Sequence, residues 1–167
     1  SQYSFNRQSL AYGSQGKLYH LHNARFEQGQ FNQAIMIEEG TTNLVTNPTN
    51  LLSGWLNSNM VVSAAGNFGN IPLFSLVPNT TSYLHNLGQA INGISDGQTV
   101  TFSTIAKAAG YTILCVEFIN RAGTYLVPKF DLSAGIVVST PSGTTASITP
   151  LGSGFYKLYF TFSNRTK

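Results

Sequence analysis

Short stretches in which apolar and polar residues alternate, separated by turns rich in Gly, Pro and Asn, recur along most of this chain. The clearest is residues 155–163, where Tyr156, Leu158 and Phe160 share one side. A two-residue period places successive side chains on opposite faces of a strand. No window keeps the 3.6-residue period of a helix, because the best candidate, residues 103–110, is short and itself alternates. We therefore predict an all-β protein.

Short strands spaced at intervals of about 8–12 residues are typical of an antiparallel β-sandwich of two sheets, and we predict a jelly roll. A chain of 167 residues is expected to form one domain. Residues 1–40 show only weak strand patterns, at 4–7, 18–22 and 34–37, and we expect them to lie as edge strands along a main sandwich formed by residues 41–167. Strands in that main part are predicted at residues 44–45, 60–63, 71–77, 82–87, 99–107, 111–119, 125–132, 136–139, 144–149 and 155–163.

Charged residues are scarce, at 9% of the chain against about 25% in a typical soluble domain. The polar surface must therefore consist mostly of Ser, Thr, Asn, Gln and Gly, which suits neutral hydroxylated ligands better than polyanions. The net charge is +3, but the nine basic residues are scattered singly along the chain. Nucleic-acid binding requires basic residues clustered on one face, so we expect no nucleic-acid partner. No apolar run reaches the roughly eighteen residues of a membrane span, and we expect no membrane insertion.

Few side chains suit a metal site or a disulfide. Cys115 is the single cysteine, which excludes an internal disulfide and a multi-cysteine zinc site. Because it lies in the apolar run 111–119, we expect a buried, inert thiol. His20 and His22 would share one face of a strand, but no acid or cysteine is close in sequence, and we interpret them as surface residues.

The acidic residues do not form an evident catalytic pair, which glycoside hydrolysis requires. Glu38 and Glu39 are adjacent, so on a strand they would point to opposite faces. Glu117 and Asp131 would come together only through folding. The chain has neither a phosphate-binding loop nor a dinucleotide-binding motif. We expect a protein that is not an enzyme.

Aromatic residues make up 12% of the chain and offer a different chemistry. A tyrosine can stack its ring on a sugar and hydrogen-bond with its hydroxyl group. Tyr83, Tyr111, Tyr125 and Tyr159 lie on or beside the polar faces of their predicted strands. Trp55 follows Gly54 in a turn-rich stretch, where it either plugs one end of the fold or presents a stacking platform.

Several motifs in this chain resemble those of known carbohydrate-binding domains. The opening Asn43-Leu-(x)2-Asn47, the following Gly54-Trp55 and the aromatic run Gly154-Phe-Tyr-Lys-Leu-Tyr-Phe-Thr-Phe162 are similar to segments of galactose-binding-like jelly-roll modules. The run Ile37-Glu-Glu-Gly-Thr-Thr-Asn-Leu44 resembles a strand of the concanavalin-like or carbohydrate-binding domains found in phage tail and receptor-binding proteins. Further segments that resemble those phage domains are Phe5-Asn-Arg-Gln-Ser9, Ala24-Arg-Phe26, Thr101-Phe-Ser-(x)3-Lys107, Phe130-Asp-Leu-Ser-Ala-Gly135 and Gly152-Ser-Gly-Phe-Tyr156.

Two positions depart from those families. The acidic residue that often follows the opening Asn, a frequent calcium ligand there, is replaced by Pro48-Thr49, which argues against a structural calcium ion at that end. We expect no cofactor. The aromatic residue that is usually Trp before the final Tyr is Phe155 here.

The resemblance implies a non-catalytic carbohydrate-binding domain of a phage tail or other virion part, or of a bacterial surface protein. Its expected partners are a polysaccharide of the host cell wall or surface and other subunits of a virion or surface assembly, and its expected location is the virion or the cell exterior. The alternative is a structural virion module that packs against neighbouring subunits without binding sugar. The candidate ligand-binding residues are Trp55, Tyr83, His85, Glu117, Arg121 and Tyr125.

Overall fold

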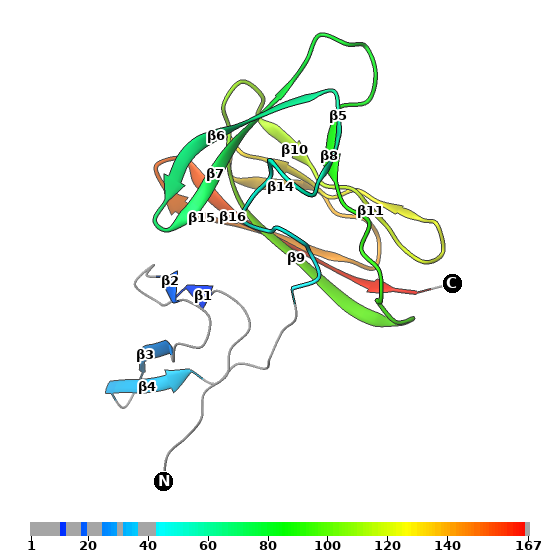
Figure 1. Ribbon diagram of the computed structural model, residues 1–167. Coiled ribbons are helices and arrows are strands. Elements are labelled where there is room, and N and C mark those ends of the chain that lie inside the picture. The colour runs from blue at the N-terminus through cyan, green and yellow to red at the C-terminus, as the bar shows by residue number, and fades with distance from the viewer. Residues whose placement is uncertain (1–10, 13–17, 20–24, 30–31, 37–42, 166–167) are drawn as a thin grey trace. The chain divides into compact units, whose positions relative to one another are not determined.

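The structure is a computed structural model in which every regular element that it describes is a β-strand (Figure 1). It describes the backbone of residues 11–12, 18–19, 25–29 and 32–36, and both backbone and side chains of residues 43–165. None of these residues belongs to a helix that is long and apolar enough to cross a membrane. The prediction of an all-β, antiparallel chain is confirmed, and the chain divides into two compact units, Ser1–Asn92 and Gly93–Lys167.

Unit 1 consists of antiparallel strand pairs. The longest is the hairpin of β6 (Met60–Phe68) and β7 (Ile71–Pro78), which bends and twists along its length (Figure 1). A register shift between Ala64 and Asn67 interrupts its ladder, and Gly66 takes a positive φ of 83° there. The other pairs are β1 (Ala11–Tyr12) with β2 (Leu18–Tyr19), β3 (Arg25–Gly29) with β4 (Asn32–Met36), and β5 (Leu56–Ser58) with β8 (Asn86–Gly88).

Residues 43–55 form a loop, so the predicted strand at residues 44–45 is wrong. The backbone N–H of Val45 donates to Asn43 Oδ1 at 3.1 Å. The backbone of Thr46 bonds the side chain of Gln89, which accepts from the Thr46 N–H at 3.0 Å and donates to the Thr46 carbonyl at 2.5 Å. Because amide side chains satisfy these backbone groups, the segment needs no partner strand.

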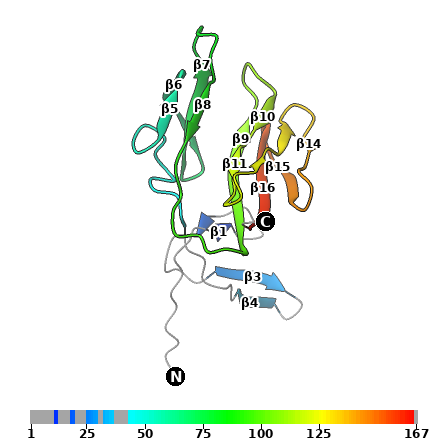
Figure 2. The same cartoon turned by 90° about the vertical axis from the view of Figure 1, so that its right-hand side faces the viewer.

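Unit 2 contains two three-stranded antiparallel sheets and a short two-stranded ladder. In the first sheet, β16 (Phe155–Asn164) lies between β15 (Thr145–Gly152) and β9 (Gln98–Lys107). β9 and β16 run alongside each other over their full lengths, so that the end of β16 lies beside the start of β9 (Figures 1 and 2). The second sheet has the order β10 (Ile113–Cys115), β13 (Lys129–Asp131), β14 (Ile136–Ser139), and β11 (Phe118–Ile119) pairs with β12 (Tyr125–Leu126).

The apolar core of unit 2 consists of two clusters, and Ala146 packs against both of them. Leu158 and Phe160 on β16 and Phe130 on β13 are fully buried, and burying each such side chain stabilises the fold by about 1.5–3 kcal/mol. Phe118 stacks against Phe160, with ring centroids 5.2 Å apart, and touches Phe102 edge-on at 5.4 Å. The predicted alternation of residues 155–163 is confirmed, because the even-numbered side chains face this core.

The predicted strand at residues 111–119 is present as two shorter pieces, β10 and β11, and the one at 125–132 as β12 and β13. Pro128 explains the interruption: it has no N–H to donate, so only the bond from Val116 N to Pro128 O, at 3.2 Å, bridges the gap. The alternation persists across the break, with Leu114, Val116 and Phe118 turned towards the core. Cys115 is therefore exposed, and the prediction of a buried thiol is wrong.

Other strand predictions differ from the structure mainly at their ends. The stretch 82–87 is extended only from Asn86, as β8, while β15 continues past residue 149 to Gly152. The predicted strand at 4–7 lies outside the described residues, as do parts of those at 18–22 and 34–37, whose described parts fall in β2 and β4.

Candidate ligand-binding surfaces

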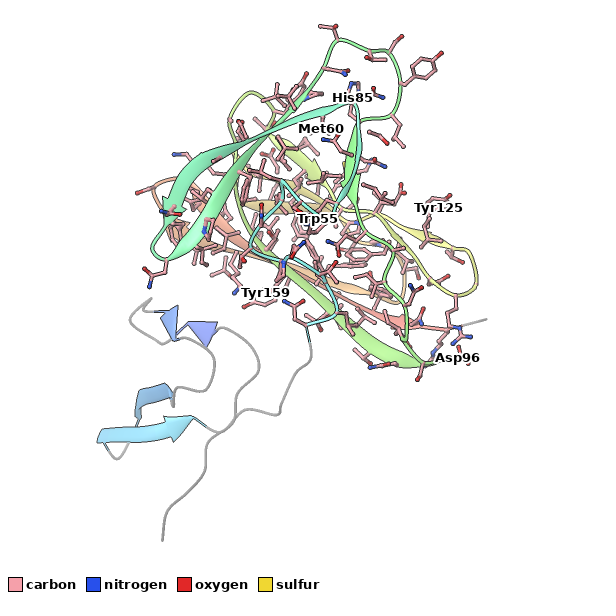
Figure 3. All side chains as sticks on the ribbon, in the orientation of Figure 1. Trp55, Met60, His85, Asp96, Tyr125 and Tyr159 are labelled. Atoms are coloured by element: carbon pink, nitrogen blue, oxygen red, sulfur yellow. The ribbon has the colours of Figure 1, made fainter. Side chains whose placement is uncertain are left out.

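Trp55 holds the loop of residues 43–55 together. Its side chain is half-buried and its indole Nε1 donates to the Asn47 carbonyl at 3.3 Å (Figure 3). Asn47, with a positive φ of 51°, also donates from Nδ2 to the Ser53 carbonyl at 3.2 Å. Trp55 thus has a structural partner within its own loop.

Tyr83 and His85 lie in the segment between β7 and β8. The Tyr83 ring is 78% exposed. His85 Nε2 lies 3.1 Å from the Asn79 carbonyl and 3.3 Å from Asn79 Oδ1, and because both of these atoms are acceptors, Nε2 is the donor. His85 therefore fixes the turn that follows β7, and Tyr83 remains available at its surface.

The other three sequence-predicted residues come together in unit 2, on and beside the β11–β12 hairpin. Tyr125, labelled in Figure 3, is directly opposite Ile119 in the ladder. Both residues are exposed. Glu117 is exposed just before β11. Arg121 is at the turn, where its backbone N–H donates to Asn164 Oδ1 at 3.1 Å and its Nη1 to the Ile94 carbonyl at 3.5 Å. The six candidates thus belong to two units, three to each.

A seventh residue, Tyr159, lies at the centre of a sheet face rich in hydroxyl groups. On the side of the β15–β16–β9 sheet away from the core, Tyr159 is directly opposite Ser147 on β15 and Ser103 on β9. The next row along β16 places Thr161 between Thr145 and Thr101, and the hydroxyl oxygens of Thr101 and Thr161 are 3.0 Å apart. We call this surface the hydroxyl face, and define it by Thr101, Ser103, Thr145, Ser147, Tyr159 and Thr161.

Cations border one end of the hydroxyl face. Lys157 Nζ lies 5.4 Å from the centroid of the Tyr159 ring. Lys107 Nζ lies 5.1 Å from the centroid of the Phe155 ring, which is its cross-strand partner. Ammonium groups over aromatic faces are attracted by the ring quadrupole, so these contacts help to fix the orientation of both rings. The hydroxyl face itself carries no carboxylate.

The local sequence predicts which side chains of β16 lie on this face, but not which residues of the neighbouring strands lie beside them. The alternation of residues 155–163 places Lys157, Tyr159 and Thr161 on one side of a strand. The partners Ser103 and Ser147 follow only from strand register, which depends on long-range pairing that the local pattern does not specify. Tyr159 was therefore one of four tyrosines noted on or beside polar strand faces, but it was not among the six candidate ligand-binding residues.

Asp131 uses its carboxylate to shape a turn. Its Oδ1 accepts from the Ser133 hydroxyl at 2.6 Å, the Ser133 N–H at 2.8 Å and the Ala134 N–H at 3.0 Å. These bonds, led by the Ser133 hydroxyl, lower the pKa of the Asp131 carboxyl below its ordinary value. Within residues 43–165 no three His, Cys, Asp or Glu side chains gather as ligands for a metal ion, and His20 and His22 lie outside the described residues.

Comparison with known proteins adds no relative: neither a protein-family model nor a curated protein sequence matches this chain.

Proposed function

We propose that this protein is a non-catalytic carbohydrate-binding domain of a phage tail or a bacterial surface protein, and that it mediates adhesion to a host cell-wall or surface polysaccharide. The hydroxyl face is the observation that carries this proposal. Tyr159, 39% exposed, offers an aromatic surface on the central strand of a three-stranded sheet. The Ser and Thr hydroxyls around it both donate and accept hydrogen bonds, as the hydroxyls of a sugar do.

The proposed fold is a two-sheet antiparallel jelly roll like that of carbohydrate-binding modules. The shared core between the two sheets of unit 2 supports it, since packing face to face is how a sandwich buries its inner side chains. A sheet face is also a rigid support, which reduces the entropy lost when a sugar chain binds.

A multivalent screen against a glycan array and a set of cell-wall polysaccharides tests this function. We expect at least one reproducible hit, and we expect Tyr159→Ala to weaken it about tenfold through loss of the aromatic contact. Tyr111→Ala is the matched control, because Tyr111 is 72% exposed and lies outside the hydroxyl face. Trp55→Ala and Tyr125→Ala test the candidates suggested by the sequence. No hit in either library would refute the proposal.

A second candidate function, a structural module that packs against other subunits, draws on a different observation. On the other sheet of unit 2, Ile113 and Ile136 remain 46% and 53% exposed. Exposed apolar patches commonly mark protein–protein contacts. A protein that binds no glycan but forms a stable complex with a neighbouring virion subunit would favour this alternative.

A further inference from the structure

The second sheet of unit 2 and the β11–β12 hairpin expose apolar side chains on their side away from the core. Ile113 and Ile136 flank Asp131 in the ladder, while Ile119 and Tyr125 face each other across the hairpin. Leu114, Val116 and Phe118 point into the core, so the odd-numbered residues from 113 to 119 lie on the opposite side. We call this surface the apolar face, defined by Ile113, Ile119, Tyr125 and Ile136 with the charged residues Glu117, Lys129 and Asp131, the last of which lies between Ile113 and Ile136.

The apolar face leaves large parts of its apolar side chains in water. Four of them are between 46% and 63% exposed. Apolar side chains gathered on one exposed surface commonly mark interaction sites. Val138, 50% exposed on β14, extends it further.

Both signs of charge are present on this face. Lys129 is directly opposite Cys115 in the ladder, and Glu117 is two residues beyond Cys115 on the same side of the chain. A two-fold axis passing between Glu117 and Lys129 would bring each of them against its opposite charge in a second copy. In such an isologous contact one patch serves both partners.

We propose that the apolar face pairs with the same face of a second copy of this chain, about a two-fold axis close to Cys115. The pairing covers the exposed isoleucines and joins Glu117 of one copy to Lys129 of the other. It also leaves the hydroxyl face of each copy accessible, because that face lies on the opposite side of the unit 2 core. A dimer would therefore present two ligand faces, which raises avidity for a polymeric ligand.

Cys115 allows a direct test with the natural sequence. It is the only cysteine in the chain and it is exposed, so any covalent dimer formed by a short bis-maleimide must join two copies through it. We expect dimers by analytical ultracentrifugation at micromolar to millimolar protein and rapid cross-linking at the same concentrations. Ile136→Lys should abolish both, whereas Tyr83→Lys, which adds the same charge at an exposed ring in unit 1, should change neither.

Charge reversal provides a second readout that loss of folding would not produce. Glu117→Lys or Lys129→Glu alone should weaken dimerisation at least several-fold, and the double variant should restore it. A protein that remains monomeric at every concentration would overturn the proposal. So would cross-linking that is no faster in the natural protein than in Ile136→Lys. Neither outcome bears on glycan binding, because the test uses no sugar and spares Tyr159.

Discussion

Asn164 connects three parts of unit 2 through a single buried amide. Its side chain is only 5% exposed. Oδ1 accepts from the Arg121 N–H at 3.1 Å, while Nδ2 donates to the carbonyls of Ile94 and Ser95, both at 3.3 Å. Its backbone carbonyl accepts from Gly97 at 2.7 Å. Nothing in the local sequence singles out this residue, because an Asn near the end of a polar stretch ordinarily marks a turn.

We expect Asn164→Ala to lower the free energy of unfolding by about 2–3 kcal/mol, since it leaves buried polar groups without partners. Ser163→Ala, the neighbouring control, removes the bond to the Gly97 carbonyl and the bond accepted from Arg165 Nε, both of them exposed, and should cost about 1 kcal/mol or less. Urea unfolding followed by circular dichroism measures both. Equal losses for the two variants would contradict the structural role assigned to Asn164.

Asp131 makes unfolding depend on pH in a defined direction. Its carboxyl pKa is lowered in the folded protein by the bonds from Ser133 and Ala134. A lowered folded-state pKa stabilises the fold above the unfolded pKa of about 3.9, and this contribution is lost as the pH falls through the folded-state value. In Asp131→Asn the acid-side decline in stability should therefore be shallower between pH 5 and 2. Carbon-detected NMR titration of Asp131 should give a pKa below the ordinary range, and Ser133→Ala should raise it.

Strand positions followed from the sequence wherever one face of a strand was buried. The predicted locations of β9, β14 and β16 are confirmed, and the alternation in β16 also identified its core-facing side chains. The predictions of strands failed where a feature other than the hydrophobic periodicity determines the backbone pairing. Pro128 breaks a ladder through its missing N–H, and Gln89 binds the backbone of Thr46 from a distant part of the chain. Long-range register, which the local pattern does not contain, placed Ser103 and Ser147 beside Tyr159.

The turn between β13 and β14 requires glycine for two reasons. Gly135 has a φ of 68°, and a Cβ added there would lie 2.7 Å from Tyr156 Cε1. Gly143, with a φ of 72°, has open space around it. Gly143→Ala should cost about 1–2 kcal/mol for the left-handed backbone alone. Gly135→Ala should cost at least about 1 kcal/mol more, because the Tyr156 ring must move. Thermal unfolding of the two variants compares them, and a Gly143→Ala loss as large as that of Gly135→Ala would exclude the steric contribution.

At the scale of the whole molecule, the two outer faces of unit 2 differ in chemistry. The hydroxyl face is polar, with the Lys157 ammonium over the Tyr159 ring. The apolar face exposes isoleucines together with Glu117, Lys129 and Asp131. Under the two proposals, one side of unit 2 binds the ligand and the other side self-associates. This division also separates Tyr125, on the apolar face, from the proposed sugar site, although the sequence placed it among the ligand-binding candidates.

The most direct test of the proposed function is an NMR titration of the isotope-labelled protein with a polysaccharide identified in the screen. The largest amide shifts should fall on β16 around Tyr159 and on its partners Ser103 and Ser147. Tyr159→Ala should make them smaller at the same polysaccharide concentration, as expected for binding that is about tenfold weaker. The amide signals of Tyr83 and His85 should not shift. Shifts concentrated instead at residues 117–125 or 83–85, with the region of Tyr159 unaffected, would contradict the assignment of the hydroxyl face as the carbohydrate-binding site.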